Sequence, residues 1–192
     1  MTWMASAMRA AQAQLDTATH NLANVASDGF RRVRSSLALT GHGLVAHESP
    51  DAAQGGIRET GRTLDLALLG PGAFLAGGVR TRDGAFVRDR DGYLADQQGR
   101  RVRGIDGPIR ISESARVQPD GSIRAAGRLV GRLPLPAGTT VRSGALESSS
   151  VDAIGETLAV LTAQRAFETA QKTLVAIDQT REKAVNDVVR LK

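Results

Sequence analysis

The sequence predicts an α+β fold, in which long N- and C-terminal helices pair as a coiled-coil-like core and a small all-β domain is inserted between them. Heptad-spaced apolar residues at both ends of the chain predict the helices. Short β-prone runs separated by glycine turns predict the domain. The expected divisions are an N-terminal core helix over 1–30, an extended linker or loop over 31–60, a β-rich outer domain over 61–146 and a C-terminal core helix over 147–192.

The first helix is expected from about Trp3 to Ala26. Its apolar residues are spaced alternately four and three apart, which is the narrow seam of a heptad rather than the broad apolar face of a globular helix. The seam consists of Met4, Met8, Ala11, Leu15, Ala18, Leu22 and Val25. Gly29 is expected to end the helix in a left-handed conformation.

The middle of the chain has the pattern of short strands and turns. The run TLDLALL alternates leucine with other residues, as a half-buried strand does. Asp91-Gly92 marks the turn of a hairpin, and Asp120-Gly121 marks a second turn followed by a short strand.

Two glycine- and proline-rich stretches belong to the same β region. GPGAFLAGG (70–78) lacks the spacing of a phosphate-binding loop and is not followed by a helical pattern, so it is expected to form turns between strands. The prolines of RLVGRLPLPAG are typical of an edge strand or an exit segment.

The last helix is expected from about Val151 to Val189, with an N-cap among Ser148–Ser150 and Asp152 in its first turn. A narrow seam on a helix of about 39 residues needs a partner helix, from the same chain or a neighbouring copy. The seam consists of Val160, Ala163, Phe167, Ala170, Leu174, Ile177, Arg181, Ala184, Val188 and Leu191. Upstream, Val151, Ile154, Leu158 and Leu161 follow a shifted phase.

Nothing in the chain indicates an active site, a metal or a cofactor. The absence of cysteine excludes disulfides and thiolate sites, and His20, His42 and His47 are too scattered for zinc. The acids Asp83, Asp89, Asp91 and Asp96 alternate with Arg82, Arg88 and Arg90, which favours cross-strand pairing on a solvated face. We therefore expect no enzyme and no cofactor.

The net charge of +5 is concentrated in the middle of the chain. Residues 1–30 and 147–192 each carry −1, so 31–146 carry +7. The excess is spread over many turns and is not interleaved with aromatic residues, which argues against nucleic acid. No leader peptide or membrane span is visible, so we expect a soluble chain without membrane insertion.

Three blocks in order resemble the bacterial flagellar rod and hook family. LDTATHNLANVASDGFRR resembles its N-terminal signature, and SSVDAIGETLAVLTAQRAFETAQKTL resembles its C-terminal signature. TGRTLDLALLGPGAFLA and RTRDGAFVRDRDGYLADQQGRRV resemble the central block of members with an inserted β domain. His20 and Ser150 replace asparagines usual in the family. The short chain is most similar to proximal or distal rod proteins with one compact β domain.

The resemblance implies a structural subunit of the flagellar basal-body rod. In the family, terminal helices of neighbouring subunits form a helical tube that transmits motor torque across the envelope to the hook. Subunits leave through the type III export apparatus without a cleaved leader. The implied partners are copies of the chain, other rod and hook axial proteins and the export apparatus, with peptidoglycan or a bushing ring as candidates for the basic middle.

The seams and the resemblance together select candidate assembly residues. They are Met8, Leu15, Asn21, Leu22, Asn24 and Val25 on the first helix, and Leu158, Leu161, Gln164, Arg165, Phe167, Leu174 and Ile177 on the last. Asp28, Gly29 and Phe30 are the candidate junction between helical core and outer domain. Two alternatives stay open: a basic nucleic-acid-binding module, and a secreted coiled-coil adaptor unrelated to flagella.

Overall fold

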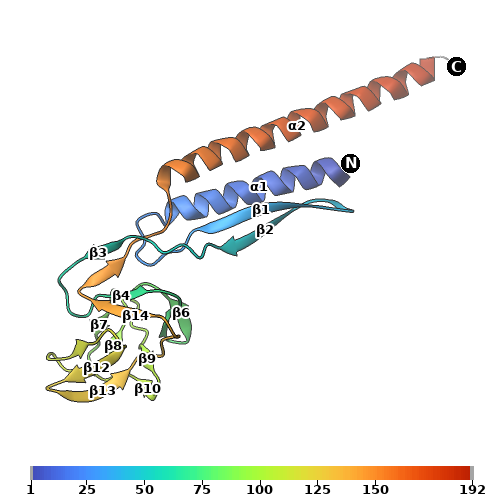
Figure 1. The fold of residues 1–192 in the computed structure, drawn as a ribbon. Coiled ribbons are helices and arrows are strands. Elements are labelled where there is room, and N and C mark those ends of the chain that lie inside the picture. The colour runs from blue at the N-terminus through green and yellow to red at the C-terminus, as the bar shows by residue number, and fades with distance from the viewer. Residues whose placement is uncertain (1, 191–192) are drawn as a thin grey trace. The chain divides into compact units, whose positions relative to one another are not determined.

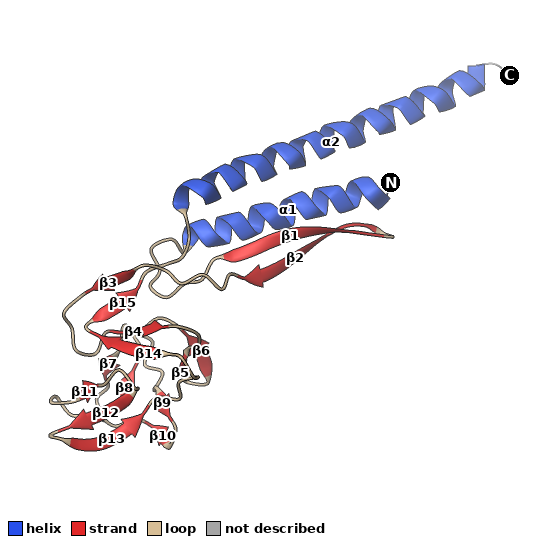
Figure 2. Cartoon of the chain, in the orientation of Figure 1, coloured by secondary structure: helices blue, strands red, loops and turns tan. Residues whose placement is uncertain are grey.

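The computed structural model describes the backbone of residues 2–190 and the side chains of residues 3–184. The chain forms two compact units. The helical unit contains both terminal helices and the hairpin of residues 33–51, and the β unit contains residues 24–32 and 52–151. Figure 2 distinguishes the helices from the strands.

The helical unit is built on two helices, α1 (Thr2–Ala23) and α2 (Ala153–Arg190), which pack together (Figure 1). The predicted pairing of the terminal helices within an α+β fold is therefore confirmed. Helix α1 ends before Ala26, because Ser27 donates its N–H and Oγ–H to the backbone and side-chain oxygens of Asn24 in a turn. Gly29 is left-handed, with φ of 69°, but it lies in a later turn and not at the helix end. Neither helix, over its described residues, is long and apolar enough to cross a membrane.

Residues 33–50 form a β-hairpin, which corrects the prediction of a linker or loop over 31–60. Strand β1 (Val33–Thr40) pairs antiparallel with β2 (Gly43–Pro50), from Val33↔Pro50 to Thr40↔Gly43. The hairpin packs against α1, which lies between it and α2 (Figure 1). Many hairpin residues are polar, so the alternation that normally indicates a strand is weak, although the backbone ladder does not depend on the side chains.

The β unit consists of short antiparallel strands. One sheet has three strands in the order β11-β12-β13, and the others have two. The strands are β3 (Ile57–Glu59), β4 (Leu66–Leu69), β5 (Phe74–Ala76), β6 (Val79–Thr81), β7 (Val87–Arg88), β8 (Leu94–Ala95), β9 (Arg103–Gly104), β10 (Gly107–Pro108), β11 (Arg116–Val117), β12 (Ser122–Ala125), β13 (Arg128–Arg132), β14 (Thr140–Ser143) and β15 (Ala145–Glu147).

The core of the β unit contains few aromatic residues. Phe74 and Phe86 pack edge to face with ring centroids 4.9 Å apart, within a cluster of buried leucine, isoleucine and valine side chains. Strand β4 departs from the predicted half-buried pattern, because Ala67 and Asp65 are buried as well as the leucines beside them. It is covered on both faces, whereas an alternating strand is covered on one.

The predicted turns and the edge strand are confirmed. Gly92, with φ of 87°, turns the β7–β8 hairpin, and Gly121, with φ of 79°, turns β11 into β12. The glycine-rich stretch 70–78 forms a bend before β5 and a turn after it. Strand β13 lies at the edge of its sheet, and the prolines follow it.

Asp120 fixes the turn between β11 and β12. Ser122 donates its hydroxyl (2.7 Å) and its N–H (3.0 Å) to one carboxylate oxygen, and Arg132 donates to the other (2.9 Å). These bonds, chiefly those from Ser122, lower the pKa of Asp120 from 3.8 to about 2. The ionised carboxylate therefore stabilises the fold above pH 3.8, and this contribution is lost as the pH falls toward 2.

We expect Asp120→Asn to lower the melting temperature at neutral pH, because asparagine cannot make these charge-assisted bonds. The difference from the parent chain should shrink as the pH falls from 3.8 to 2, since the parent carboxylate becomes neutral there. Thermal melts followed by circular dichroism over this range test it. A difference in melting temperature that stays constant with pH would show that the charge of Asp120 does not contribute to stability.

Candidate assembly interface

Helix α1 has two covered faces. The predicted seam is one of them: Ala11 and Ala18 are buried, and Met8, Leu15 and Leu22 are half-buried. The other face carries Ser6, Thr17 and Asn21, which hydrogen-bond to the hairpin. The seam is thus the side of α1 on which α2 packs, and part of it is already covered within one chain.

Asn21 holds the start of β1. Its side chain is 1% exposed, donates to the carbonyl of Val33 (2.8 Å) and accepts the N–H of the same residue (2.8 Å). Thr17 donates to the Glu48 carboxylate on β2. We assign Asn21 to the hairpin contact within the chain and not to a neighbour.

The turn of the hairpin approaches α1 closely. Ser6 Oγ accepts the N–H of Leu44 (3.2 Å), and a Cβ on Gly43 would lie 2.2 Å from that oxygen. Gly43 also has φ of 123°, so glycine is required there for both reasons. This contact explains why the hairpin belongs to the helical unit.

Helix α2 starts at a cap and packs with one face. Asp152 Oδ1 accepts the N–H of Ile154 (3.1 Å), so Asp152 is the cap in place of Ser148–Ser150. The packed face runs straight along the helix and does not change side near Thr162. Its covered residues are Glu156, Val160, Ala163, Phe167, Ala170 and Leu174.

The apolar residues of shifted phase form an exposed stripe on α2. Ile154, Leu158 and Leu161 are 75%, 59% and 46% exposed. At about 100° per residue they lie roughly half a turn away from Ala163 and Phe167. The other predicted contact residues on α2, Gln164, Arg165 and Ile177, are also exposed, and on the segment after α1 Val25 is exposed and Asn24 is half-buried.

The predicted junction residues are built into the β unit. Gly29 donates its N–H to the carbonyl of Glu147 (2.6 Å), and Ser150 donates its N–H to the carbonyl of Phe30 (3.0 Å). Asp28 accepts from Arg58 (3.2 Å). The segments by which the chain enters and leaves the β unit are therefore joined by hydrogen bonds.

A buried ion pair, Arg82–Glu147, lies beside the junction. The side chains are 5% and 1% exposed and 2.7 Å apart. Arg82 also donates to the carbonyls of Leu68, Gly70 and Gly72, and a Cβ on Gly29 would lie 2.3 Å from its backbone. The prediction of a solvated face for Arg82 is wrong, because no local spacing links two residues 65 apart.

The acidic residues of the β7–β8 hairpin pair differently from the prediction. Asp89 and Asp91 both accept from Arg101, whose guanidinium also lies over the Tyr93 ring at 4.3 Å. Within the described residues no group of three or more acids and histidines is placed to hold a metal ion. These carboxylates hold Arg101 against the turn.

Residues 142–187 match a protein-family model described as the C-terminal region of flagellar basal body rod FlgEFG proteins. The chain is 30% identical to the flagellar basal-body rod protein FlgF of Mesorhizobium japonicum, over 85% of this chain and 86% of that protein. The chain belongs to the flagellar basal-body rod protein family. It is also 25% identical to the rod protein FlgG of Bacillus subtilis, over 94% of this chain and 96% of that protein. It is 28% identical to the rod protein FlgF of Escherichia coli, over 95% of this chain and 95% of that protein.

Membership of the rod protein family makes this chain a structural subunit of the flagellar basal-body rod and not an enzyme. It also implies assembly with other rod and hook proteins. The two alternatives, a nucleic-acid-binding module and an unrelated adaptor, are set aside. The matched segment 142–187 includes both faces of α2, the packed one and the exposed stripe.

Proposed function

We propose that this rod subunit polymerises through its terminal helices into a helical tube that transmits motor torque to the hook. The observation that carries the proposal is the exposed apolar stripe of Ile154, Leu158 and Leu161. Large apolar side chains aligned on one helix face favour burial against another protein. The stripe is separate from the face that α1 covers, so it is free for a neighbouring subunit.

The unequal lengths of the helices supply a second surface. At about 1.5 Å per residue, α2 with 38 residues is roughly 57 Å long and α1 with 22 residues roughly 33 Å. Ile177, a seam residue toward the far end of α2, is 37% exposed. We propose that a neighbour's helix covers this part of the seam, which continues the coiled-coil pattern from one subunit to the next.

Contacts between different faces of identical chains generate a helical filament when the rotation does not close into a ring. The proposed partners are copies of this chain, other rod and hook axial proteins and the export apparatus. Asp28, Gly29 and Phe30 would connect the helical core to an outer β unit. The basic β unit would face peptidoglycan or a bushing ring.

Thiol protection tests the helix contact, because the chain has no cysteine and an introduced one is the only thiol. Leu161→Cys should react with a polar maleimide in dilute protein and be protected in purified basal bodies. Gln97→Cys, on an exposed turn of the β unit, is the control and should react in both. Equal reactivity of Leu161→Cys in both states would refute the proposed contact.

A further inference from the structure

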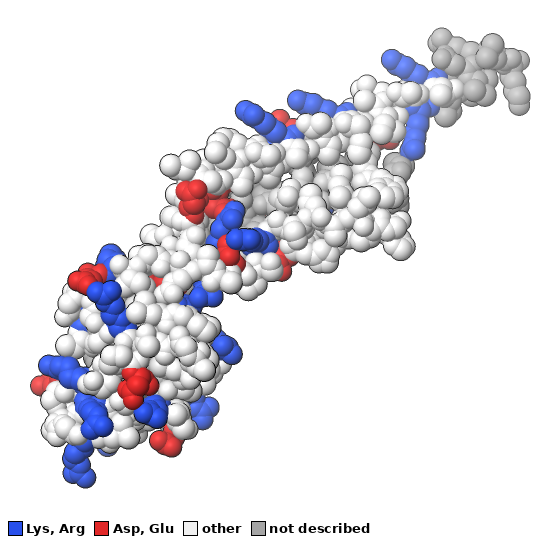
Figure 3. All heavy atoms as spheres, viewed as in Figure 1, with Lys and Arg blue, Asp and Glu red and all other residues white. Residues whose placement is uncertain are grey.

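The β unit carries an excess of arginine that its own carboxylates do not neutralise. Residues 24–32 and 52–151 contain 17 arginines, no lysine and 11 acidic residues. Ion pairs engage Arg58, Arg62, Arg82, Arg100, Arg101, Arg132 and Arg142. Basic side chains are visible at many places on this unit in Figure 3.

Two of the remaining arginines converge on one cavity. Arg88, on β7, and Arg110, after β10, line an open cavity of about 510 Å³. Its other lining residues are Ile111, Ser112, Ala125 and Val130. Arg88 Nη2 lies 3.4 Å, and Arg110 Nε 3.6 Å, from the position that a Cβ on Gly92 would occupy. Neither guanidinium makes an ion pair with any carboxylate of the described residues. We refer to this site as the arginine cavity.

The nearby sheet repeats the same pattern of charge. Arg116 and Arg124 stand directly opposite each other in the β11–β12 ladder. Like charges in that position destabilise a sheet, although each guanidinium donates to a nearby carbonyl, Arg116 to that of Ala115 (3.0 Å) and Arg124 to that of Gly127 (3.2 Å). Proteins break local rules of this kind at functional sites.

We propose that the arginine cavity binds a carboxylate side chain from an acidic segment of a neighbouring protein. Guanidinium groups pair with carboxylates through two parallel hydrogen bonds, and Ser112 offers a further hydroxyl. Ala125 and Val130, which is 39% exposed, give an apolar wall for the methylene groups of a glutamate. The partner class rests on the proposed function, since a subunit of a rod that crosses the envelope meets other proteins there.

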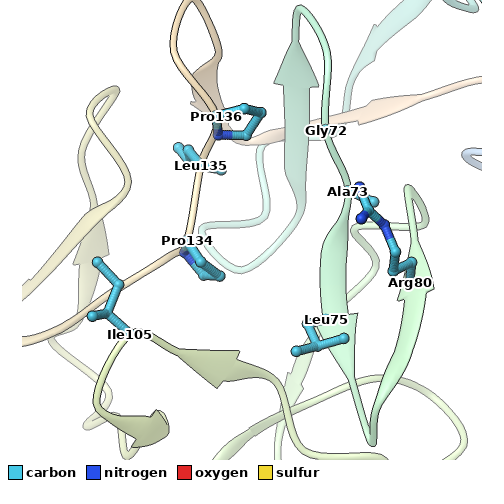
Figure 4. A pocket seen from close by; sticks show the side chains of 8 residues that line it. All are labelled: Gly72, Ala73, Leu75, Arg80, Ile105, Pro134, Leu135 and Pro136. Atoms are coloured by element: carbon cyan, nitrogen blue, oxygen red, sulfur yellow. The ribbon is translucent and has the colours of Figure 1, made fainter.

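A further cavity of the β unit and its aromatic residues argue for this choice of site and ligand. That cavity, between β5, β6 and residues 134–136 (Figure 4), is lined by apolar side chains and by a single arginine, Arg80. Binding of single-stranded nucleic acid relies on exposed aromatic rings on which the bases stack. Phe30 is half-buried, Tyr93 is half-buried against Arg101, and Phe74 and Phe86 are buried. The β unit therefore offers charge without a stacking surface.

The test uses the full chain and a fluorescent hexaglutamate peptide, with binding followed by fluorescence anisotropy at low salt. Arg88→Gln combined with Arg110→Gln should weaken binding by at least about tenfold, because two charge-assisted bonds are lost. Arg80→Gln combined with Arg103→Gln removes the same charge from exposed arginines outside the cavity and should weaken it by less than about twofold.

Equal weakening by both pairs of substitutions would show general attraction and overturn the proposal. The absence of peptide binding would also overturn it. So would the finding that single-stranded DNA or phosphatidylglycerol vesicles compete with the labelled peptide as strongly as unlabelled peptide does. The result is independent of rod assembly. If the helix contact is wrong, Leu161→Cys stays reactive in basal bodies while the peptide still binds. If the arginine cavity does not bind carboxylates, the peptide does not bind there while Leu161→Cys is still protected in basal bodies.

Discussion

Replacing Glu147 with alanine is expected to lower the free energy of unfolding of the β unit by about 3–5 kcal/mol. The substitution leaves the guanidinium of Arg82, which is 5% exposed, buried without its counter-charge. It also removes the acceptor of the Gly55 N–H (3.3 Å). The carbonyls of Leu68, Gly70 and Gly72 still accept from Arg82, but they do not neutralise its charge.

Glu59→Ala is the matched control, because Glu59 forms an ion pair with Arg142 in which the side chains are 73% and 48% exposed. An exposed pair of this kind contributes about 0–1 kcal/mol. Hydrogen exchange at the β4 amides gives the stability of the β unit, whereas fluorescence of Trp3 reports on α1. Equal losses in the two variants would mean that the buried pair is not what holds the unit together.

A second substitution separates charge from packing. Combining Arg82→Met with Glu147→Leu removes both charges and should recover part of the stability lost in Glu147→Ala. The recovery should be incomplete, since three carbonyls lose their donor.

The architecture of the chain was predictable because periodicity is a local signal. The seam of Leu15, Leu22, Phe167 and Leu174 predicted two paired helices without any information on where they meet. The turns at Gly92 and Gly121 were predictable for the same reason, since a left-handed conformation favours glycine.

What was missed depends on contacts between distant segments. Asn21 and Thr17 of α1 hydrogen-bond to the β1–β2 hairpin and hold it in place. The polar sequence of the hairpin itself shows no clear alternation of apolar and polar residues. Arg82 and Glu147 are joined only by the fold. The shifted phase on α2 was visible in the sequence, but only the structure separates Leu158 and Leu161, which are exposed, from Phe167, which is half-buried. Of the predicted contact residues, the exposed ones are thus the direct candidates.

Changing Leu158 and Leu161 together to aspartate is expected to abolish swimming while the chain stays folded. The two side chains are 59% and 46% exposed, so their loss removes little packing within one chain. In the proposed rod, each aspartate would place a charge in an apolar contact between subunits, and every copy would carry it. Phe167→Asp or Leu22→Asp should also stop assembly, but these half-buried positions disturb the α1–α2 pairing as well.

Thr169→Asp combined with Gln171→Asp adds the same charge to exposed positions of α2 outside both apolar faces. A strain that produces this control variant is expected to swim. Both double variants should keep the helical circular dichroism of the parent chain.

The most direct measurement is the swimming of a strain that lacks the parent chain and produces either double variant at normal level. Assembly through the exposed stripe of α2 predicts no swimming and no completed rods with Leu158→Asp and Leu161→Asp, and normal swimming with Thr169→Asp and Gln171→Asp. Full swimming with the leucine variant would contradict assembly through this face of α2.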